Sequence, residues 1–150
     1  MKTYFNKSLF VALSILVMGF ASCNKDDDSV AKPEITLTEV GHDNCKQAHP
    51  GHDMHLEAEI VAEGLINRID VEIRQEDGGT FEIEASYTDG KYIGVRNTEF
   101  HEHIDIPADA PLGDYHLHFT VTDKEGQQTT VECELALTAA DGDDEDDDED

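Results

Sequence analysis

Residues 33–138 are predicted to fold as an all-β domain of about seven antiparallel strands. Three observations lead to this prediction. Apolar and polar residues alternate with a period of two in seven separate runs. Short segments rich in Asp and Gly separate several of these runs. The whole stretch spans about 100 residues, which is enough for two packed sheets and one core.

The seven alternating runs carry apolar side chains on one face and charged or polar side chains on the other. This pattern is typical of antiparallel strands that cover a core with one face and meet water with the other. Turn sequences at 76–79, 88–90 and 123–126 separate neighbouring runs. Seven short strands in about 100 residues have the size and rhythm of an immunoglobulin-like antiparallel β-sandwich. The runs are 35–40, 56–60, 69–73, 81–84, 104–106, 115–121 and 131–137.

The two ends of the chain differ from the middle. Residues 1–22 combine a basic start at Lys2 and Lys7, an apolar run at 9–18 and small residues before Cys23. These features predict a secretory signal peptide, and the apolar run is too short for a comfortable transmembrane helix. Residues 23–32 are predicted to be a tether. Residues 139–150 are predicted to be a disordered acidic tail, because they hold almost no apolar side chains.

Negative charge excludes one class of partner. The chain holds 35 Asp and Glu against 10 Lys and Arg, a formal net charge of -25. Nucleic-acid binding requires a basic surface, so nucleic acid is not an expected partner. Anionic membrane surfaces are disfavoured as electrostatic partners for the same reason. Residues 33–138 contribute 23 acids and 6 bases to this balance, so the domain itself is strongly acidic.

Residues 106–126 resemble the last two strands of bacterial Ig-like domains. In those domains a Gly-x-Tyr step opens the penultimate strand, as at Gly113 and Tyr115. An Asp-x-x-Gly turn then leads to the final strand, as at Asp123 and Gly126. The resemblance implies that Tyr115 is the corner tyrosine near the start of its strand.

The segment around Cys23 resembles the lipobox of bacterial lipoproteins, in which the cysteine is acylated and becomes the mature N-terminus. Asp26, Asp27 and Asp28 resemble the acidic export signal of Bacteroidetes lipoproteins. Together these features resemble a family of Bacteroidetes Ig-like lipoproteins of unassigned function. The resemblance implies lipidation at Cys23, a lipid anchor in the outer membrane and display on the cell surface, with a periplasm-facing location as the alternative. An ordinary signal peptide followed by a chance cysteine is the other interpretation.

Histidine is the unusual residue of the domain. Two His-x-His pairs lie on predicted strands, where residues i and i+2 share a face about 6.5–7 Å apart. Four more histidines lie in or beside the segment between the first two runs. Imidazoles surrounded by carboxylates suit Zn(II), Cu(II) or Ni(II), and zinc is the first expectation. The alternatives are polar filling of outward positions and pH sensing. The candidate ligands are His42, His49, His52, His55, His101, His103, His116 and His118.

Topology predicts where these histidines gather. In an Ig-like sandwich the first connection and the one between 104–106 and 115–121 lie at the same pole. Strand alternation directs His55, His101 and His103 outward, with His55 and His103 side by side. His116 and His118 belong to the opposite sheet, so we expect a satellite site there. Loop residues His42, His49 and His52 would complete the first coordination sphere.

Two cysteines remain after Cys23. Outside the cytoplasm they most simply pair, so a Cys45–Cys133 disulfide is predicted. The alternative is that Cys45 is a metal ligand and Cys133 a buried thiol.

No nucleophile motif, phosphate-binding loop or zinc-protease motif occurs, so the protein is not expected to be an enzyme. The first functional hypothesis is a surface lipoprotein that captures or buffers a metal and passes it to an outer-membrane transporter. The second is an interaction module that docks on a surface protein or a glycan.

Overall fold

The fold comes from a computed structural model that describes residues 30–140. The predicted signal peptide at 1–22, the lipidation candidate Cys23 with most of the tether at 23–32, and residues 141–150 of the acidic tail lie outside the described residues. Within residues 30–140, no helix has the length and apolar character needed to cross a membrane.

The described chain is all-β, as predicted, and contains eight strands and one 3-10 turn, η1 (His42–Asn44). Each of the seven predicted runs falls on a strand, although Phe81 and Ile106, at the ends of two runs, lie just outside the strands. The additional strand, β2, has only two residues, which is too short for an alternating pattern to reveal. The strands are β1 (Glu34–Val40), β2 (Gln47–Ala48), β3 (Asp53–Val61), β4 (Ile66–Gln75), β5 (Glu82–Tyr87), β6 (Asn97–Asp105), β7 (Gly113–Asp123) and β8 (Gln128–Leu137).

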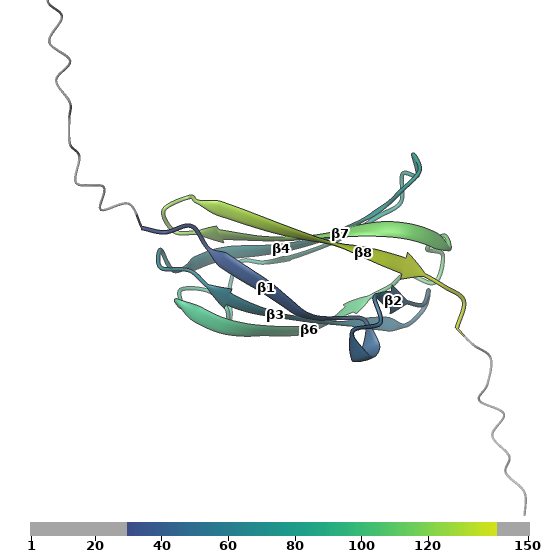
Figure 1. Ribbon diagram of the computed structural model, residues 1–150, viewed down its shortest axis with the longest axis horizontal. Coiled ribbons are helices and arrows are strands. Elements are labelled where there is room, and N and C mark those ends of the chain that lie inside the picture. Colours follow the sequence, from purple (N-terminus) through teal and green to yellow (C-terminus); the bar gives the residue numbers. More distant parts are fainter. Residues whose placement is uncertain (1–29, 141–150) are drawn as a thin grey trace, which may run out of the picture.

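The strands form two sheets that lie face to face (Figure 1). One sheet has three strands in the order β1-β3-β6, and the other has five in the order β2-β8-β7-β4-β5. All neighbouring strands are antiparallel except β2 and β8, which are parallel. Because β3 lies between β1 and β6, the outward side chains of these three strands share one surface.

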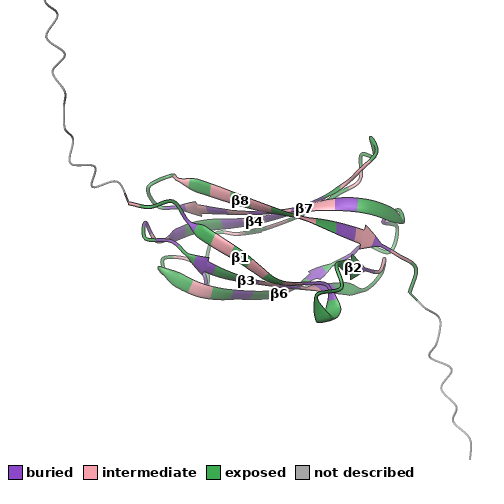
Figure 2. Ribbon diagram, viewed as in Figure 1, coloured by how far each residue is buried: buried purple, intermediate pink, exposed green. Residues whose placement is uncertain are grey.

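The core lies between the two sheets and is built from alternate residues of the strands (Figure 2). Leu56, Ala58 and Ile60 of β3 point inward and are at most 1% exposed, as the alternation predicts. Phe100 of β6 stacks edge-on against Phe119 of β7 with ring centroids 5.0 Å apart, so aromatic packing joins the sheets. The inward direction of these side chains fixes the outward direction of their neighbours.

Tyr115, the predicted corner tyrosine, is completely buried at the start of β7. Its hydroxyl donates a hydrogen bond of 2.7 Å to the carbonyl of Pro111. Burial raises the pKa of the phenol above its ordinary value. The side chain therefore ties the connection between β6 and β7 to the start of β7.

The predicted Cys45–Cys133 disulfide is absent from the structure, in which both residues are free thiols. Cys45 follows the 3-10 turn η1 and is exposed, with its Sγ 3.7 Å from the carbonyl of Gln47. Cys133 pairs with Leu117 across β7 and β8 and packs against the core. The two side chains thus face different environments, because the turn directs one thiol to solvent while strand alternation directs the other inward.

Candidate metal site on the three-stranded sheet

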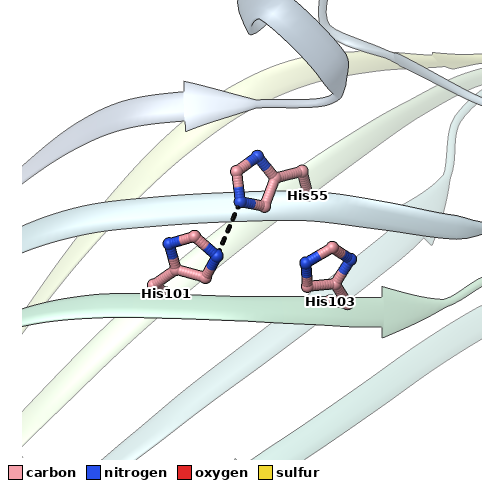
Figure 3. Close-up of side chains that lie close together, drawn as sticks. All are labelled: His55, His101 and His103. Carbon is pink, nitrogen blue, oxygen red and sulfur yellow. Dashed lines mark hydrogen bonds between the residues drawn. The ribbon is translucent and has the colours of Figure 1, made fainter.

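Three imidazoles come together on the outer face of the β1-β3-β6 sheet (Figure 3). His55 belongs to β3, while His101 and His103 belong to β6. His55 and His103 are direct partners in the β3–β6 register, as predicted. The ring centroid of His55 lies 4.4 Å from that of His101 and 5.0 Å from that of His103. One ring nitrogen from each residue lies within 4.8 Å of the others, so the three can share one metal ion.

A carboxylate holds each of the three rings through Nδ1. His55 Nδ1 lies 3.0 Å from Glu39 Oε1, and His101 Nδ1 lies 2.7 Å from Glu57 Oε1. His103 Nδ1 pairs with the Asp53 carboxylate. The remaining nitrogen of each ring, Nε2, is then the natural ligand atom. Metal-binding histidines commonly have this arrangement, because the carboxylate fixes the tautomer and makes the ligand nitrogen more basic.

These hydrogen bonds also change the acidity of the carboxylates. The bond with His55 is the largest influence on Glu39 and lowers the pKa of its carboxyl. The bond with His103 lowers the pKa of Asp53 in the same way. Both groups therefore stay ionised at lower pH than ordinary carboxyls, so they remain acceptors for the imidazole N–H groups.

Two of the three Nε2 atoms lie close to each other. His55 Nε2 and His101 Nε2 are 2.9 Å apart (Figure 3). A neutral imidazole has one N–H, and in both rings the carboxylate at Nδ1 accepts it. Two Nε2 lone pairs would then face each other, which is unfavourable unless a proton or a metal ion lies between them. Zn–N bonds of about 2.0–2.1 Å in a tetrahedral site put two ligand nitrogens about 3.3 Å apart, close to this separation.

Acidic side chains outnumber basic ones around the cluster, where Lys91 pairs with Glu102. No Lys or Arg occurs in the three strands of this sheet. The five-stranded sheet differs, because Arg68 and Arg74 of β4 pair with Asp70 and Glu72. A face with this excess of acidic residues raises the local concentration of cations. The acidic residues of the three strands are Glu34, Glu39, Asp53, Glu57, Glu59, Glu99, Glu102 and Asp105.

Tyr92 fixes the free edge of β6 at one of the three histidines. This residue is only 3% exposed and packs against Phe100. Its hydroxyl accepts a hydrogen bond from the His101 N–H at 3.1 Å. The hydroxyl proton is shared between the His101 carbonyl at 2.9 Å and Glu102 Oε1 at 2.6 Å. Sequence reasoning missed Tyr92, since it lies outside the strands and nine positions before the backbone that it holds.

Glu102 completes this contact. Its carboxylate lies 3.2 Å from the Lys91 ammonium as well as close to the Tyr92 hydroxyl. The hydrogen bond from Tyr92 is the main cause of a lowered pKa of Glu102, and Lys91 adds to it. The group therefore stays charged at the inward-pointing position between Phe100 and Ile104.

The loop before β3 forms a pocket of about 500 Å³ beside the three imidazoles. His49 is half-buried, and its Nδ1 lies 2.9 Å from the Thr138 carbonyl, which fastens the loop to the end of β8. His42 is exposed and pairs with Asp43 at 3.3 Å. His52, a predicted ligand, is exposed and does not line the pocket. Besides Asp53 and the three imidazoles, the lining consists of His42, Cys45, Gln47, Ala48, His49 and Met54.

His116 and His118 lie on β7 in the other sheet and are separate from the cluster, as expected of a satellite position. Their ring centroids are 6.2 Å apart. His116 Nε2 lies 2.5 Å from Glu76, and His118 Nδ1 lies 3.2 Å from Glu132. Each ring is thus held by its own carboxylate, and the structure does not bring a third ring to this pair.

The fold and the cluster define a β-rich domain with a candidate metal site made of histidines. Residues 21–138 match the model of a family described as Domain of unknown function (DUF4625), and the chain belongs to this family. No curated protein is found to match the sequence.

Two solved structures match this chain. Catalytically inactive OgpA from Akkermansia muciniphila, in complex with an O-glycopeptide substrate, is 12% identical with a TM-score of 0.52, over 74% of this chain and 30% of that chain. Spo0M, a sporulation control protein from Bacillus subtilis, is 14% identical with a TM-score of 0.45, over 75% of this chain and 51% of that chain. The chain therefore matches under a third of the first and about half of the second, and the likeness to OgpA concerns the fold alone.

Proposed function

We propose that this protein captures a divalent transition metal, zinc first, on the outer face of the β1-β3-β6 sheet. The observation that carries the proposal is the arrangement of His55, His101 and His103, whose rings converge while a carboxylate holds each one at Nδ1. Three imidazoles with an open fourth position are a familiar ligand set for zinc.

Zinc fits this donor set for two reasons. It has no geometric preference from its d electrons, so it accepts three nitrogen ligands on a flat sheet face. The Nε2 atoms of His55 and His101 lie somewhat closer together than two nitrogens of a tetrahedral zinc complex, and rotation of the rings can make up the difference, since the His101 and His103 side chains are 53% and 59% exposed. Imidazole also suits Cu(II) and Ni(II), and copper is generally bound more tightly at nitrogen sites. Competition between metals therefore belongs in the test.

The domain is proposed to be an immunoglobulin-like sandwich without catalytic activity. The β1-β3-β6 sheet facing the β8-β7-β4-β5 strands supports this class, as does the hydrogen bond from the Tyr115 hydroxyl to Pro111. The residues of the candidate site are suited to binding a metal ion, and the proposal requires no catalytic step. A bound metal would be buffered or passed to an outer-membrane transporter.

The location is proposed from the sequence around Cys23. Acylation of this cysteine would anchor the protein in the outer membrane with the domain at the cell surface, because two or more acyl chains hold a protein firmly. Radiolabelled palmitate should enter the wild-type protein and not the Cys23→Ser variant in the native host. Protease treatment of intact cells should then remove the domain. Equal labelling of both proteins would contradict the anchor, and protection from the protease would indicate the periplasm-facing alternative.

Zinc titration of the tag-free protein from Cys23 onward tests the metal site. We expect one zinc ion to bind with micromolar or tighter affinity and to shift the imidazole NMR signals of His55, His101 and His103. Zinc at 100 times its Kd stabilises the folded state by about 2.7 kcal/mol. This corresponds to a rise in melting temperature of roughly 10–20 °C for a domain of this size.

Parallel titrations with Cu(II) and Ni(II) rank the metals. If micromolar zinc, copper and nickel all leave the melting temperature and the imidazole signals unchanged, metal capture is wrong. The chain is then better explained as an interaction module whose histidines are incidental.

A further inference from the structure

We propose that the site takes its metal together with a small neutral nitrogen heterocycle, such as free histidine, which fills the fourth coordination position from the adjoining pocket. This inference rests on the proposed function, because the heterocycle is recognised through the bound metal. The ligand is thus a metal–chelator pair and not a bare ion.

Counting the donors leaves one coordination position open. The three imidazoles supply three nitrogens through Nε2. Glu39, Glu57 and Asp53 pair with the Nδ1 atoms of the same rings, and Glu57 Oε1 also lies 3.6 Å from His55 Nε2. Zinc in a protein takes four ligands, and a site with three protein ligands holds water or an exogenous group in the fourth position. The three rings lie on an outward face, so an exogenous ligand can reach the open position from solvent.

The pocket beside the rings is much larger than a metal ion or a water molecule requires. Its volume is about 500 Å³, within the range of about 300–1,000 Å³ that small-molecule sites occupy. A water molecule fills only about 30 Å³. The same pocket includes all three imidazoles in its wall, so a ligand in it would lie against the metal.

The chemistry of the lining selects the kind of ligand. Met54 and Ala48 are 1% and 3% exposed and give the base of the pocket a small apolar part. Gln47, exposed on β2, offers an amide that can hydrogen-bond a polar substituent. Ligands with an apolar body and a few polar groups fit such a surface.

The charge of this surface disfavours anionic chelators. The strands that carry the site hold eight acidic residues and no basic ones. Anionic chelators such as citrate are repelled by this face, whereas a chelator without net charge is not. Free histidine meets both requirements, since it is zwitterionic and its imidazole is a strong ligand for zinc and copper.

Calorimetric titration of L-histidine into the zinc-loaded protein and into the metal-free protein tests the proposal, with citrate as the anionic comparison. We expect histidine to bind the zinc-loaded protein at least tenfold more tightly than the metal-free protein, and citrate to bind neither. Native mass spectrometry should detect a species with one protein, one zinc and one histidine.

The Gln47→Trp variant fills the pocket and leaves the three imidazoles in place. We expect it to bind zinc with unchanged stoichiometry and to bind histidine at least tenfold more weakly than the wild type. His42→Trp, at a side chain that is 90% exposed, is the second variant if Gln47→Trp does not fold.

Three outcomes would overturn the inference. If histidine binds no more tightly with zinc than without it, the proposed heterocycle ligand is wrong, while metal capture is unaffected. If the cobalt-loaded protein shows thiolate absorption and Cys45→Ser abolishes it, the Cys45 thiolate fills the fourth position. A protein that binds no metal at all removes the proposed function and this inference together.

Discussion

Replacing His55, His101 or His103 with alanine is expected to weaken zinc binding by about a hundredfold or more. Each substitution removes one of three ligand nitrogens, and losing even an outer partner of a metal ligand commonly costs 10–100-fold in affinity. The fold should be preserved, since the three side chains point away from the core and outward substitutions usually change stability by less than about 0.5 kcal/mol. Isothermal titration calorimetry gives the affinity, and urea unfolding gives the stability of each metal-free variant.

The other sheet supplies a matched control for these substitutions. His116 and His118 have the same i, i+2 spacing on a strand and the same kind of carboxylate partners. They do not lie in the three-ring cluster. We expect His116→Ala and His118→Ala to leave the zinc affinity within a factor of two. Equal losses at both sheets would mean that zinc binds histidines without a defined site, and an unchanged affinity in the three cluster variants would exclude the cluster.

The positions of the three imidazoles could be predicted because they depend only on strand alternation and on strand neighbours. Inward packing of Leu56 and Phe100 directs His55 and His101 outward. The neighbouring placement of β3 and β6 then brings His55 beside His103. Both features follow from the apolar period and from the expected topology. No knowledge of loops or of individual side-chain conformations is needed.

The carboxylate partner on β1 could not be predicted, because a β-bulge places it. The register pairs Leu37 with Ala58 but Glu39 with Glu57, so the pairing shifts by one residue between Leu37 and Glu39. A regular strand would give Glu39 the inward parity of Leu37. The bulge turns Glu39 outward toward His55 and directs Val40 into the core. Bulges commonly redirect a side chain in this way, and the sequence carries no reliable signal for them.

The strand β6 is longer than the predicted run for a related reason. The predicted run covers only 104–106, whereas the strand is Asn97–Asp105. Glu102 occupies an inward position in it and interrupts the apolar alternation. The carboxylate is tolerated there because Tyr92 and Lys91 contact it. The local alternation pattern cannot reveal Tyr92, because this partner lies ten residues away in a connecting segment.

The loop histidines were placed least accurately. His42 and His49 line the pocket beside the cluster, but His52 does not. The path of this segment depends on left-handed residues, including Asp43, Asn44 and Lys46, and on the short parallel pairing of β2 with β8. Neither feature has a periodicity that sequence reasoning could use. The path of the loop therefore depends on local backbone conformation, above all at Gly41.

Gly41→Ala is expected to destabilise the domain by about 3 kcal/mol. Gly41 has φ 74° and ψ 168°, a conformation that is essentially restricted to glycine and costs other residues about 1–3 kcal/mol. An added Cβ would also lie 2.4 Å from the Gln47 carbonyl oxygen, a backbone atom that can move only with β2. For a domain of this size, the loss corresponds to a melting temperature lower by roughly 10–20 °C. Differential scanning calorimetry and urea unfolding measure it.

Gly90→Ala is a control that lacks the steric clash. Gly90 also has a left-handed φ, of 83°, but a Cβ there meets no atom within 4 Å. Its substitution should therefore cost only the conformational part, about 1–2 kcal/mol. Gly41→Ala should lose more stability than Gly90→Ala, because the clash with Gln47 adds to the cost of its own backbone conformation, and equal losses would contradict a rigid loop. Zinc binding should survive in Gly41→Ala below its melting temperature, because the three imidazoles are placed by the pairing of β3 and β6 and not by the loop.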